Sequence, residues 1–448
     1  MTTRIRWWAL GAAVAIGLAT AVPVASAQGG KEQPQETEVG VTADEIHIAV
    51  IADVDNAIAP GLFQGSVDGV QGFAKFINNS CKPKNTCLAG RKLVVDFLDS
   101  KLNPNEARNA IITACEQDLA MVGTAAVLLT NVDDQLACVD KAGQATGIPD
   151  LPFVATEVVQ QCSPITFPMA PPQVLCGTKD QHPQTFQASI GRAFYYNKKY
   201  GKLHGIYVFG SDSKSARNSS FASLGQVRRV CCKSDQDFDV SGLAPQPAYT
   251  PIAQALKQNN ATYAQSTSAF NSTVSLRKEA KLQGVTSVKV WDCGTQCYSP
   301  QFLEQGGADV EGQYADTLYL PFLDAKERKA NKMLANFVKY TGKNAAGGLG
   351  APYAWVAAVA FRDAVNAIAA QSGVNGLTRK SLIAALSNIH DFDAEGMFGK
   401  IDLAGRKASP CHVLSQVQNG KFVRIDPKKP GTFDCKKRNV IHVKLDLL

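Results

Sequence analysis

The chain has 448 residues, of which 45% are hydrophobic and 19% charged, and its formal net charge is +7. This length is long for one hydrophobic core and suits two lobes of ordinary size. The charge excess is weak for so large a surface, and no dense Lys/Arg block is interleaved with aromatic residues, so a nucleic-acid-binding protein is not expected. The short basic run at 436–438 fits a solvated tail.

The first 27 residues have the pattern of a secretory signal peptide. Arg4 and Arg6 precede an apolar run at 7–24, which ends in Ala25-Ser26-Ala27. We expect cleavage after Ala27 and a polar, flexible leader at 28–43, although a retained membrane anchor is the alternative. No cysteine lies near the cleavage point, so no lipid anchor is expected. The mature protein is therefore predicted to be secreted, in the extracytoplasmic space.

Strand and helix patterns alternate from residue 44 to about residue 160, which is typical of an α/β fold with a parallel sheet. Apolar, β-branched runs mark the strands, and helical spacing of apolar residues marks the helices between them. The predicted strands are 46–52, 93–98, 120–127 and 153–155, with helices at 60–78 and from Asn103-Pro104 onward.

A loop rich in proline and cysteine at 161–183 precedes a second block, in which strand and helix patterns again alternate. Its predicted helices are 185–200, 252–258 and 273–282, and its predicted strands are 203–209, 261–263 and 288–291. A nearly apolar helix at 353–370 is interrupted by Arg362 and Asp363, which favours buried core over a membrane span. Thr378 starts a shorter helix that ends near Leu386. The fold expected is α/β, with two doubly wound parallel-sheet lobes.

All twelve cysteines follow the signal sequence, and an even number in an exported chain favours six disulfides. The sequence does not fix their connectivity. A four-sulfur metal site is the alternative, built from Cys231, Cys232, Cys293 and Cys297. Short separations favour the pairs Cys81–Cys87, Cys115–Cys138, Cys162–Cys176, Cys293–Cys297 and Cys411–Cys435, which leaves the adjacent Cys231 and Cys232.

Several stretches, in this order and spacing, resemble the type I solute-binding proteins, in the leucine/isoleucine/valine-binding branch that serves ABC transporters. They are Ile48-Ala49-Val50 with the helix opening at 65–70, the segments 90–93, 249–252 and 306–312, and the closing stretch from Pro410-Cys411 to Lys421. The resemblance spans roughly residues 44–426. It implies a type I periplasmic-binding fold whose lobes are joined by a three-segment hinge. We expect lobe 1 at 44–160 and 316–390, and lobe 2 at 161–315 and 391–448.

The same resemblance implies an extracytoplasmic receptor that traps a small molecule between its lobes and delivers it to the permease of an ABC importer. A monomer without a cofactor is expected. A ligand-sensing receptor subunit on the same fold is the alternative, and an exported hydrolase is less favoured. No G-x-S-x-G, phosphate-loop or H-E-x-x-H motif occurs, and the six histidines are scattered, so neither enzymatic activity nor a metal site is expected.

Ligand contacts are predicted at the carboxyl ends of the strands, where parallel sheets hold their ligands. Family members hold an α-carboxylate through groups after the third and fourth strands of lobe 1, and an ammonium through an acidic residue of lobe 2. The matching positions are Thr124, Ala125 and Thr156 for the first group and Asp292 for the second. The remaining candidates are Asp53, Asp55 and Asn56, the hydroxyls of Ser211, Ser266 and Ser268, and the rings of Phe209, Trp291 and Tyr314.

Each candidate also has a structural interpretation. The aromatic rings could fill the core, the polar residues at 53–56 could form a turn and cap a helix, and Asp292 could pair with Lys289. Residues 127–129 are Val-Leu-Leu where the family has a hydroxyl-rich run. A carboxylate loses several kcal/mol when stripped of water without a new partner, so these residues suit one poorly. We therefore expect a small organic ligand with apolar area and a few polar handles.

Overall fold

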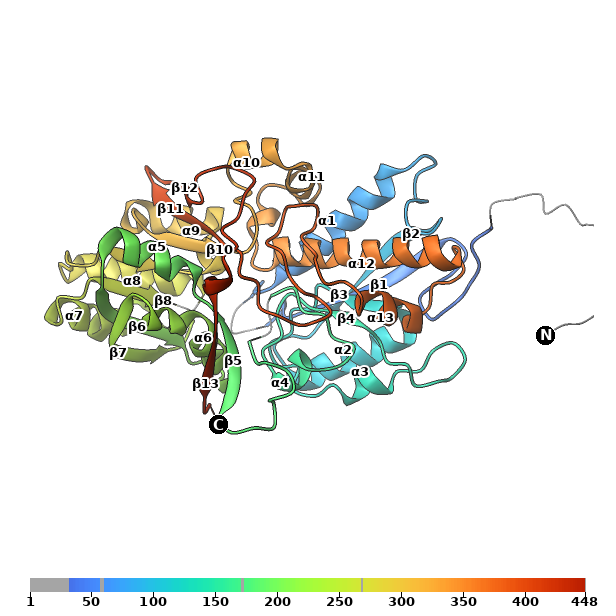
Figure 1. The fold of residues 1–448 in the computed structure, drawn as a ribbon, viewed down its shortest axis with the longest axis horizontal. Helices are drawn as coiled ribbons and strands as arrows, with labels where there is room; N and C mark the ends of the chain where they lie inside the picture. The colour runs from blue at the N-terminus through green and yellow to red at the C-terminus, as the bar shows by residue number, and fades with distance from the viewer. Residues whose placement is uncertain (1–31, 57–59, 171–172, 267–268, 448) are drawn as a thin grey trace, which may run out of the picture. The chain divides into compact units, whose positions relative to one another are not determined.

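The computed structural model describes residues 32–56, 60–170, 173–266 and 269–447 (Figure 1). The predicted signal peptide and the candidate Ser268 lie outside these residues. From Gln33 onward the chain forms one compact unit. Within the described residues, no helix combines the length and the apolar character that a membrane crossing requires.

The first sheet is parallel, with strand order β2-β1-β3-β4. Successive residues of β1 face opposite sides: Ile48 and Val50 join the core under α1, whereas Ala49 and Ile51 join the core under α2. Helices therefore cover both faces, as in a doubly wound fold. The elements are β1 (Glu45–Ala52), α1 (Gln64–Ser80), β2 (Lys92–Asp99), α2 (Pro104–Gln117), β3 (Ala120–Val122), α3 (Asp133–Ala137), β4 (Asp150–Leu151) and α4 (Val158–Gln161).

The second sheet, β7-β6-β8-β9, is also parallel and repeats the winding order of the first. Tyr207 and Phe209 of β6 face the core that contains α5, and Ile206 and Val208 face the core of α7 and α8. The elements are α5 (Gly191–Tyr200), β6 (Leu203–Gly210), α6 (Lys214–Ser223), β7 (Cys232–Val240), α7 (Thr250–Gln258), β8 (Tyr263–Ser266), α8 (Phe270–Leu282), β9 (Val290–Asp292) and α9 (Pro300–Gly306).

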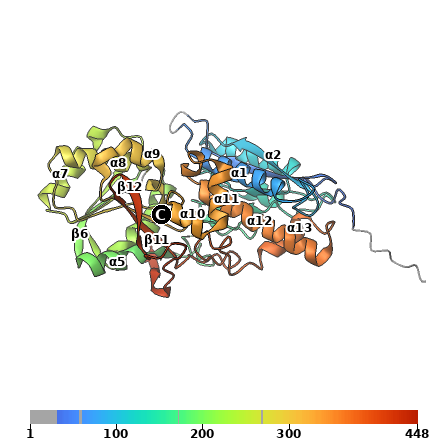
Figure 2. The same ribbon diagram turned by 90° about the horizontal axis from the view of Figure 1, so that it is seen from above.

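Helix α12 (Ala351–Ser372) packs against α1 as core, as its apolar sequence predicted. Trp355 of α12 stacks on Phe76 of α1, with ring centroids 5.6 Å apart, and meets Phe73 edge-on. Figure 2 shows α1, α11 and α12 grouped beside one another. The other helices here are α10 (Ala325–Ala330), α11 (Lys332–Thr341) and α13 (Arg379–Leu386), and 3₁₀ turns lie at 224–229, 246–249, 295–297, 307–310, 345–347 and 437–439.

Three chain segments lie side by side where the chain passes between the two sheets. Gln187 accepts from the Ala408 amide and donates to the Arg406 carbonyl, and the Gly399 amide donates to the Leu318 carbonyl. The strands here are β5 (Gln184–Ser189), β10 (Tyr314–Thr317), β11 (Val413–Gln418), β12 (Lys421–Asp426) and β13 (Val440–Leu445). Strand β10 pairs with the β11–β12 hairpin, and β13 pairs antiparallel with β5.

Some predicted elements are wrong in type or length. The segment 185–200 is not one helix, because its first five residues belong to β5, which pairs with β13 about 250 residues away in the chain. The strand at 120–127 ends at Val122, because Gly123 has φ +76° and turns the chain. The fourth strand of the first sheet lies at Asp150–Leu151 rather than at 153–155. Strand β7 was not predicted, since most of its residues are polar and exposed.

The twelve cysteines form six disulfides, and each joins one cysteine to the next along the chain. Five of these bridges match the pairs that the spacing favoured. The two cysteines left over, Cys231 and Cys232, are bonded to each other. No free cysteine remains among the described residues. The alternative four-sulfur metal site is therefore not formed.

The close contact between β6 and β8 gives a test of the fold. A Cβ at Gly205 would overlap the carbonyl oxygen of Tyr263 on the neighbouring strand. Gly205→Ala should therefore lower the free energy of unfolding by roughly 1–3 kcal/mol, measured by urea denaturation. The control is Gly242→Ala, where a Cβ meets only an Asp212 side-chain oxygen at 3.2 Å. Equal stability of the two variants would contradict this packing.

Candidate functional site

Asp53 ties together the loops at the carboxyl ends of three strands of the first sheet. One carboxylate oxygen accepts from the Ser100 hydroxyl at 2.6 Å and from the Leu102 amide at 2.8 Å. The other accepts from the Val127 amide at 2.8 Å. Asp53 is buried. Its carboxylate thus fixes the shape of the sheet edge where a ligand is expected.

The two threonines that match the family's carboxylate-binding positions already have partners inside the protein. The Thr124 hydroxyl donates to Asp150 at 2.7 Å, and the Thr156 hydroxyl donates to the Val127 carbonyl at 2.8 Å. Between them, Asp53 and Thr156 occupy both backbone groups of Val127. Neither backbone group of Val127 is therefore left for a ligand.

The other candidates of the first sheet form the same edge. Ala125 forms a bridge with Ala52, and its carbonyl accepts from the Asp53 amide at 3.1 Å. The Asp55 amide donates to Asp99 at 2.9 Å, and its own side chain is exposed. Asn56 is buried next to the undescribed residues 57–59. The structure brings Asp53, Ala125, Thr124 and Thr156 together around one loop.

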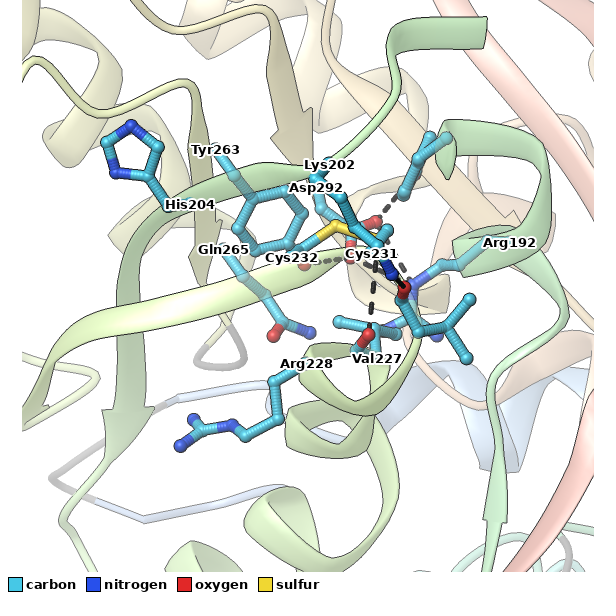
Figure 3. Close-up of a disulfide and its surroundings, with 12 residues drawn as sticks. Arg192, Lys202, His204, Val227, Arg228, Cys231, Cys232, Tyr263, Gln265 and Asp292 are labelled. Atoms are coloured by element: carbon cyan, nitrogen blue, oxygen red, sulfur yellow. Dashed lines mark hydrogen bonds and ion pairs between the residues drawn. A yellow bond between two sulfur atoms is a disulfide. The ribbon is translucent and has the colours of Figure 1, made fainter. Parts of the chain in front are cut away.

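In the second sheet, Asp292 forms a buried ion pair with Arg192 of α5 rather than with Lys289. The Arg192 Nε lies 2.9 Å from one Asp292 oxygen and 3.1 Å from the other. Tyr263 and Tyr196 donate to the same carboxylate at 2.6 and 2.8 Å. Burial, with the Asp292 charge as the next cause, raises the pKa of both tyrosines well above the usual value. Figure 3 shows Tyr263, Arg192 and Asp292 around the Cys231–Cys232 disulfide.

The remaining candidates lie on different faces of the second sheet. Phe209 and Tyr314 are fully buried in the same core as Tyr263, and the Tyr314 hydroxyl lies 2.8 Å from that of Tyr200. Trp291 packs on the opposite side, where the Arg277 guanidinium lies 4.4 Å from its ring. Ser211 is exposed at the end of β6. Ser266 is buried at the end of β8, and its hydroxyl has no hydrogen-bond partner among the described residues.

Sequence reasoning missed the partners of these residues. Arg192 is the central one, because its guanidinium also lies 3.5 Å from Asp316 and donates to the Leu224 carbonyl. A charged residue within the apolar start of a helix, Ile190-Gly191-Arg192-Ala193, was the available signal. Asp150 was missed as well, since it lies in a two-residue strand.

Comparisons with known proteins identify the family and the fold of the chain. A model of the periplasmic binding protein family matches residues 45–421. The chain is similar to an ABC transporter substrate-binding protein of Aeropyrum pernix, with 14% identity over 88% of this chain and 97% of that one and a TM-score of 0.65. A search of curated protein sequences finds no match.

Two further solved structures are similar. One is the fatty acid ABC transporter substrate-binding protein of Thermomonospora curvata, at 14% identity over 92% of this chain and 96% of that one, with a TM-score of 0.65. The other is the branched-chain amino acid transporter substrate-binding protein of Streptococcus pneumoniae in complex with isoleucine, at 16% identity, 85% and 100% coverage and a TM-score of 0.61. At these identities the structures establish a shared fold.

The pKa of Asp150 gives a prediction about pH. Burial raises this pKa from 3.8 to about 7, although hydrogen bonds from Thr124 and Gln160 oppose the rise. Between these values the folded chain keeps a proton that the unfolded chain releases, so stability falls as pH rises from about 4 to about 7. Asp150→Asn should reduce this loss by roughly 2–4 kcal/mol, measured as unfolding free energies at about pH 5 and about pH 8. Asp55→Asn, on an exposed side chain, should keep the parental pH dependence.

The Arg192–Asp292 pair gives a second prediction. Asp292→Asn removes a negative charge that balances the buried guanidinium. The free energy of unfolding should therefore fall by roughly 3–5 kcal/mol in urea titrations. As the control, Asp235→Asn breaks the half-exposed pair with His204 and should cost less than about 1 kcal/mol. An Asp292→Asn variant with parental stability would show that the pair does not support the core.

Proposed function

The chain belongs to the periplasmic binding protein family, as its motifs predicted, and from this premise we propose that it is an extracytoplasmic receptor for an ABC importer. In this proposal two lobes close on a small organic molecule and the closed form docks on a membrane permease. Closure requires a ligand that binds the closed form better than the open one, so groups of both sheets must contact it. The family consists of binding proteins, and no catalytic step is proposed.

We infer that the ligand is largely apolar with a few polar handles. The observation that carries this inference is that the Thr124 and Thr156 hydroxyls and the Val127 amide are all engaged within the protein. A ligand carboxylate that used these groups would have to break those hydrogen bonds, at a cost of about 1–3 kcal/mol for each lost partner. The half-buried aliphatic side chains of Val127 and Leu128 instead offer apolar contact.

Polar handles are available elsewhere at the strand ends. The Ser266 hydroxyl is buried without a partner among the described residues, which favours a role as a ligand contact. Asp55 and Ser211 are exposed at the ends of β1 and β6. A solved structure with the same fold is that of a fatty acid transporter's binding protein, which supports including acyl chains among the ligands tested.

The remaining parts of the proposal follow the sequence. Residues 1–27 act as a cleaved signal peptide, and the mature chain is a monomer without a lipid anchor. Its lobes are 44–160 with 316–390, and 161–315 with 391–448. Three adjoining segments, near Gln187, Leu318 and Ala408, support a hinge at that place. A small number of short segments can bend together without disturbing either core.

A thermal-shift screen tests the ligand class on the purified, disulfide-bonded protein. The panel contains leucine, isoleucine, medium-chain fatty acids, aromatic acids, amides and polyols. Apolar organic compounds should raise the melting temperature with concentration, whereas free branched-chain amino acids should leave it unchanged, because a ligand stabilises only the state it binds. If leucine or isoleucine gave the largest shift, the inference from residues 127–129 would be wrong.

A variant at the same loop sharpens this test. Val127→Thr keeps the side-chain volume but replaces a methyl with a hydroxyl, so affinity for the best apolar ligand should fall about threefold to tenfold. The control is Val139→Thr, on a valine that is 48% exposed, and it should bind as the parent does. Equal affinities in isothermal titration would place Val127 outside the ligand contacts.

A further inference from the structure

His412 has an unusual arrangement of its two ring nitrogens. Its Nδ1 lies 2.9 Å from a carboxylate oxygen of Asp316, at the end of β10. A carboxylate only accepts, so Nδ1 carries the proton and the lone pair of the neutral ring is on Nε2. Nε2 is buried without a hydrogen-bond partner among the described residues, and the side chain is only 7% exposed. A buried acceptor of this kind normally has a partner.

Two carboxylates lie near the His412 ring. One oxygen each of Asp426 and Asp434 lies with a His412 ring nitrogen in a group whose members are all within 4.8 Å of one another. Ligands of a tetrahedral Zn²⁺ ion, each about 2.0–2.2 Å from the metal, lie roughly 3.3–3.6 Å apart. The side chains of this group must therefore move closer together to hold an ion.

The backbone holds the three residues in place. His412 and Asp434 exchange amide-to-carbonyl hydrogen bonds of 3.0 and 3.1 Å, and the Cys411–Cys435 disulfide joins their neighbours. Asp426 pairs with Leu414 at the base of the β11–β12 hairpin. The ligand group is therefore built on a paired framework rather than on a single loop.

Gly191 leaves room in front of the imidazole. A Cβ at this position, the first residue of α5, would lie 2.5 Å from His412 Nε2. Gly191 also lines a cavity of about 330 Å³, together with Asp426 and Asp434. Four cationic side chains line the same cavity and compete with a bound cation: Lys198, Lys199, Lys436 and Arg438.

The carboxylates around the site favour a bound cation, whereas a neighbouring lysine competes with it. Burial lowers the pKa of His412, but the carboxylates of Asp316, Asp434 and Asp426 outweigh it and raise this pKa overall. A divalent ion would satisfy the same carboxylates without a second proton on the ring. Lys436 pairs with Asp434 and must be displaced, which its exposed side chain allows.

We propose that His412 Nε2, Asp426 and Asp434 form a binding site for a divalent transition-metal ion of the Zn²⁺ type, with Asp316 as the residue that orients the imidazole. One imidazole with two carboxylates suits Zn²⁺ better than Mg²⁺ or Ca²⁺, which prefer oxygen ligands alone. A carboxylate on the other ring nitrogen is the usual support of a metal-binding histidine. Water from the cavity would complete the coordination.

The second group with suitable side chains, His47 with Asp96 and Asp118, is a poorer candidate. Both nitrogens of His47 already have carboxylate partners, Asp96 at 2.8 Å and Glu45 at 3.3 Å. Its imidazole is also 28% exposed. A metal there would have to displace an existing partner, so this group serves as the internal comparison for the test.

The test is a ZnCl₂ titration of the full, disulfide-bonded protein after treatment with a chelator, followed by isothermal calorimetry. One Zn²⁺ should bind per chain at neutral pH, and excess Mg²⁺ should not compete. Asp426→Asn and His412→Gln should each weaken binding at least about tenfold, and Gly191→Ala should weaken it by filling the approach to Nε2. Binding should also weaken as the pH falls, because protons compete for Nε2.

Matched variants separate this site from others. His390→Gln removes another histidine paired with an aspartate, on a 62% exposed side chain, and should bind Zn²⁺ as the parent does. Asp426→Asn should keep the parental melting temperature without metal, because no hydrogen bond among the described residues uses that carboxylate. Unchanged Zn²⁺ affinity in both Asp426→Asn and His412→Gln would overturn the proposal. So would a loss of binding in His47→Gln, or no Zn²⁺ binding by the parent.

Discussion

The buried guanidinium of Arg192 is the interaction on which much of the second sheet depends. A charge in this environment is tolerated only when it is paired and hydrogen-bonded, and here Asp292 and Asp316 share it. The pair joins α5, β9 and β10, and Tyr196 and Tyr263 complete the carboxylate's hydrogen bonds. Because Asp316 also holds the His412 ring, the same network extends to the segments that pass between the two sheets.

In the first sheet, too, buried polar groups have hydrogen-bond partners inside the protein. Asp53 and Thr156 satisfy the backbone of the loop that follows β3, and Asp150 takes the hydroxyl of Thr124. Polar groups that could have met a ligand are thus used to fix loop shape. The likeness in fold to amino-acid-binding proteins does not by itself imply a likeness of ligand chemistry.

Local patterns predicted most of the fold. Strand β1 and the helix starts at Asn103 and Thr378 depend on residues close in sequence, and the structure has each of them. Strand β5 was missed because its partner, β13, lies at the far end of the chain. The partners of Asp292, Thr124 and His412 are also distant in sequence, and the side of the sheet on which a residue such as Trp291 falls depends on register. Candidate ligand-binding positions could therefore be predicted from the strand ends, but the residues that pair with them could not.

The order of the disulfides has a consequence for biogenesis. Each cysteine is bonded to the next one along the chain, at separations of 1 to 24 residues, and no two bridges interleave. If the chain is exported amino end first, as proposed, each cysteine leaves the translocation pore shortly before its correct partner. Bonding each cysteine to the next one that emerges would then give this set of disulfides without reshuffling by an isomerase.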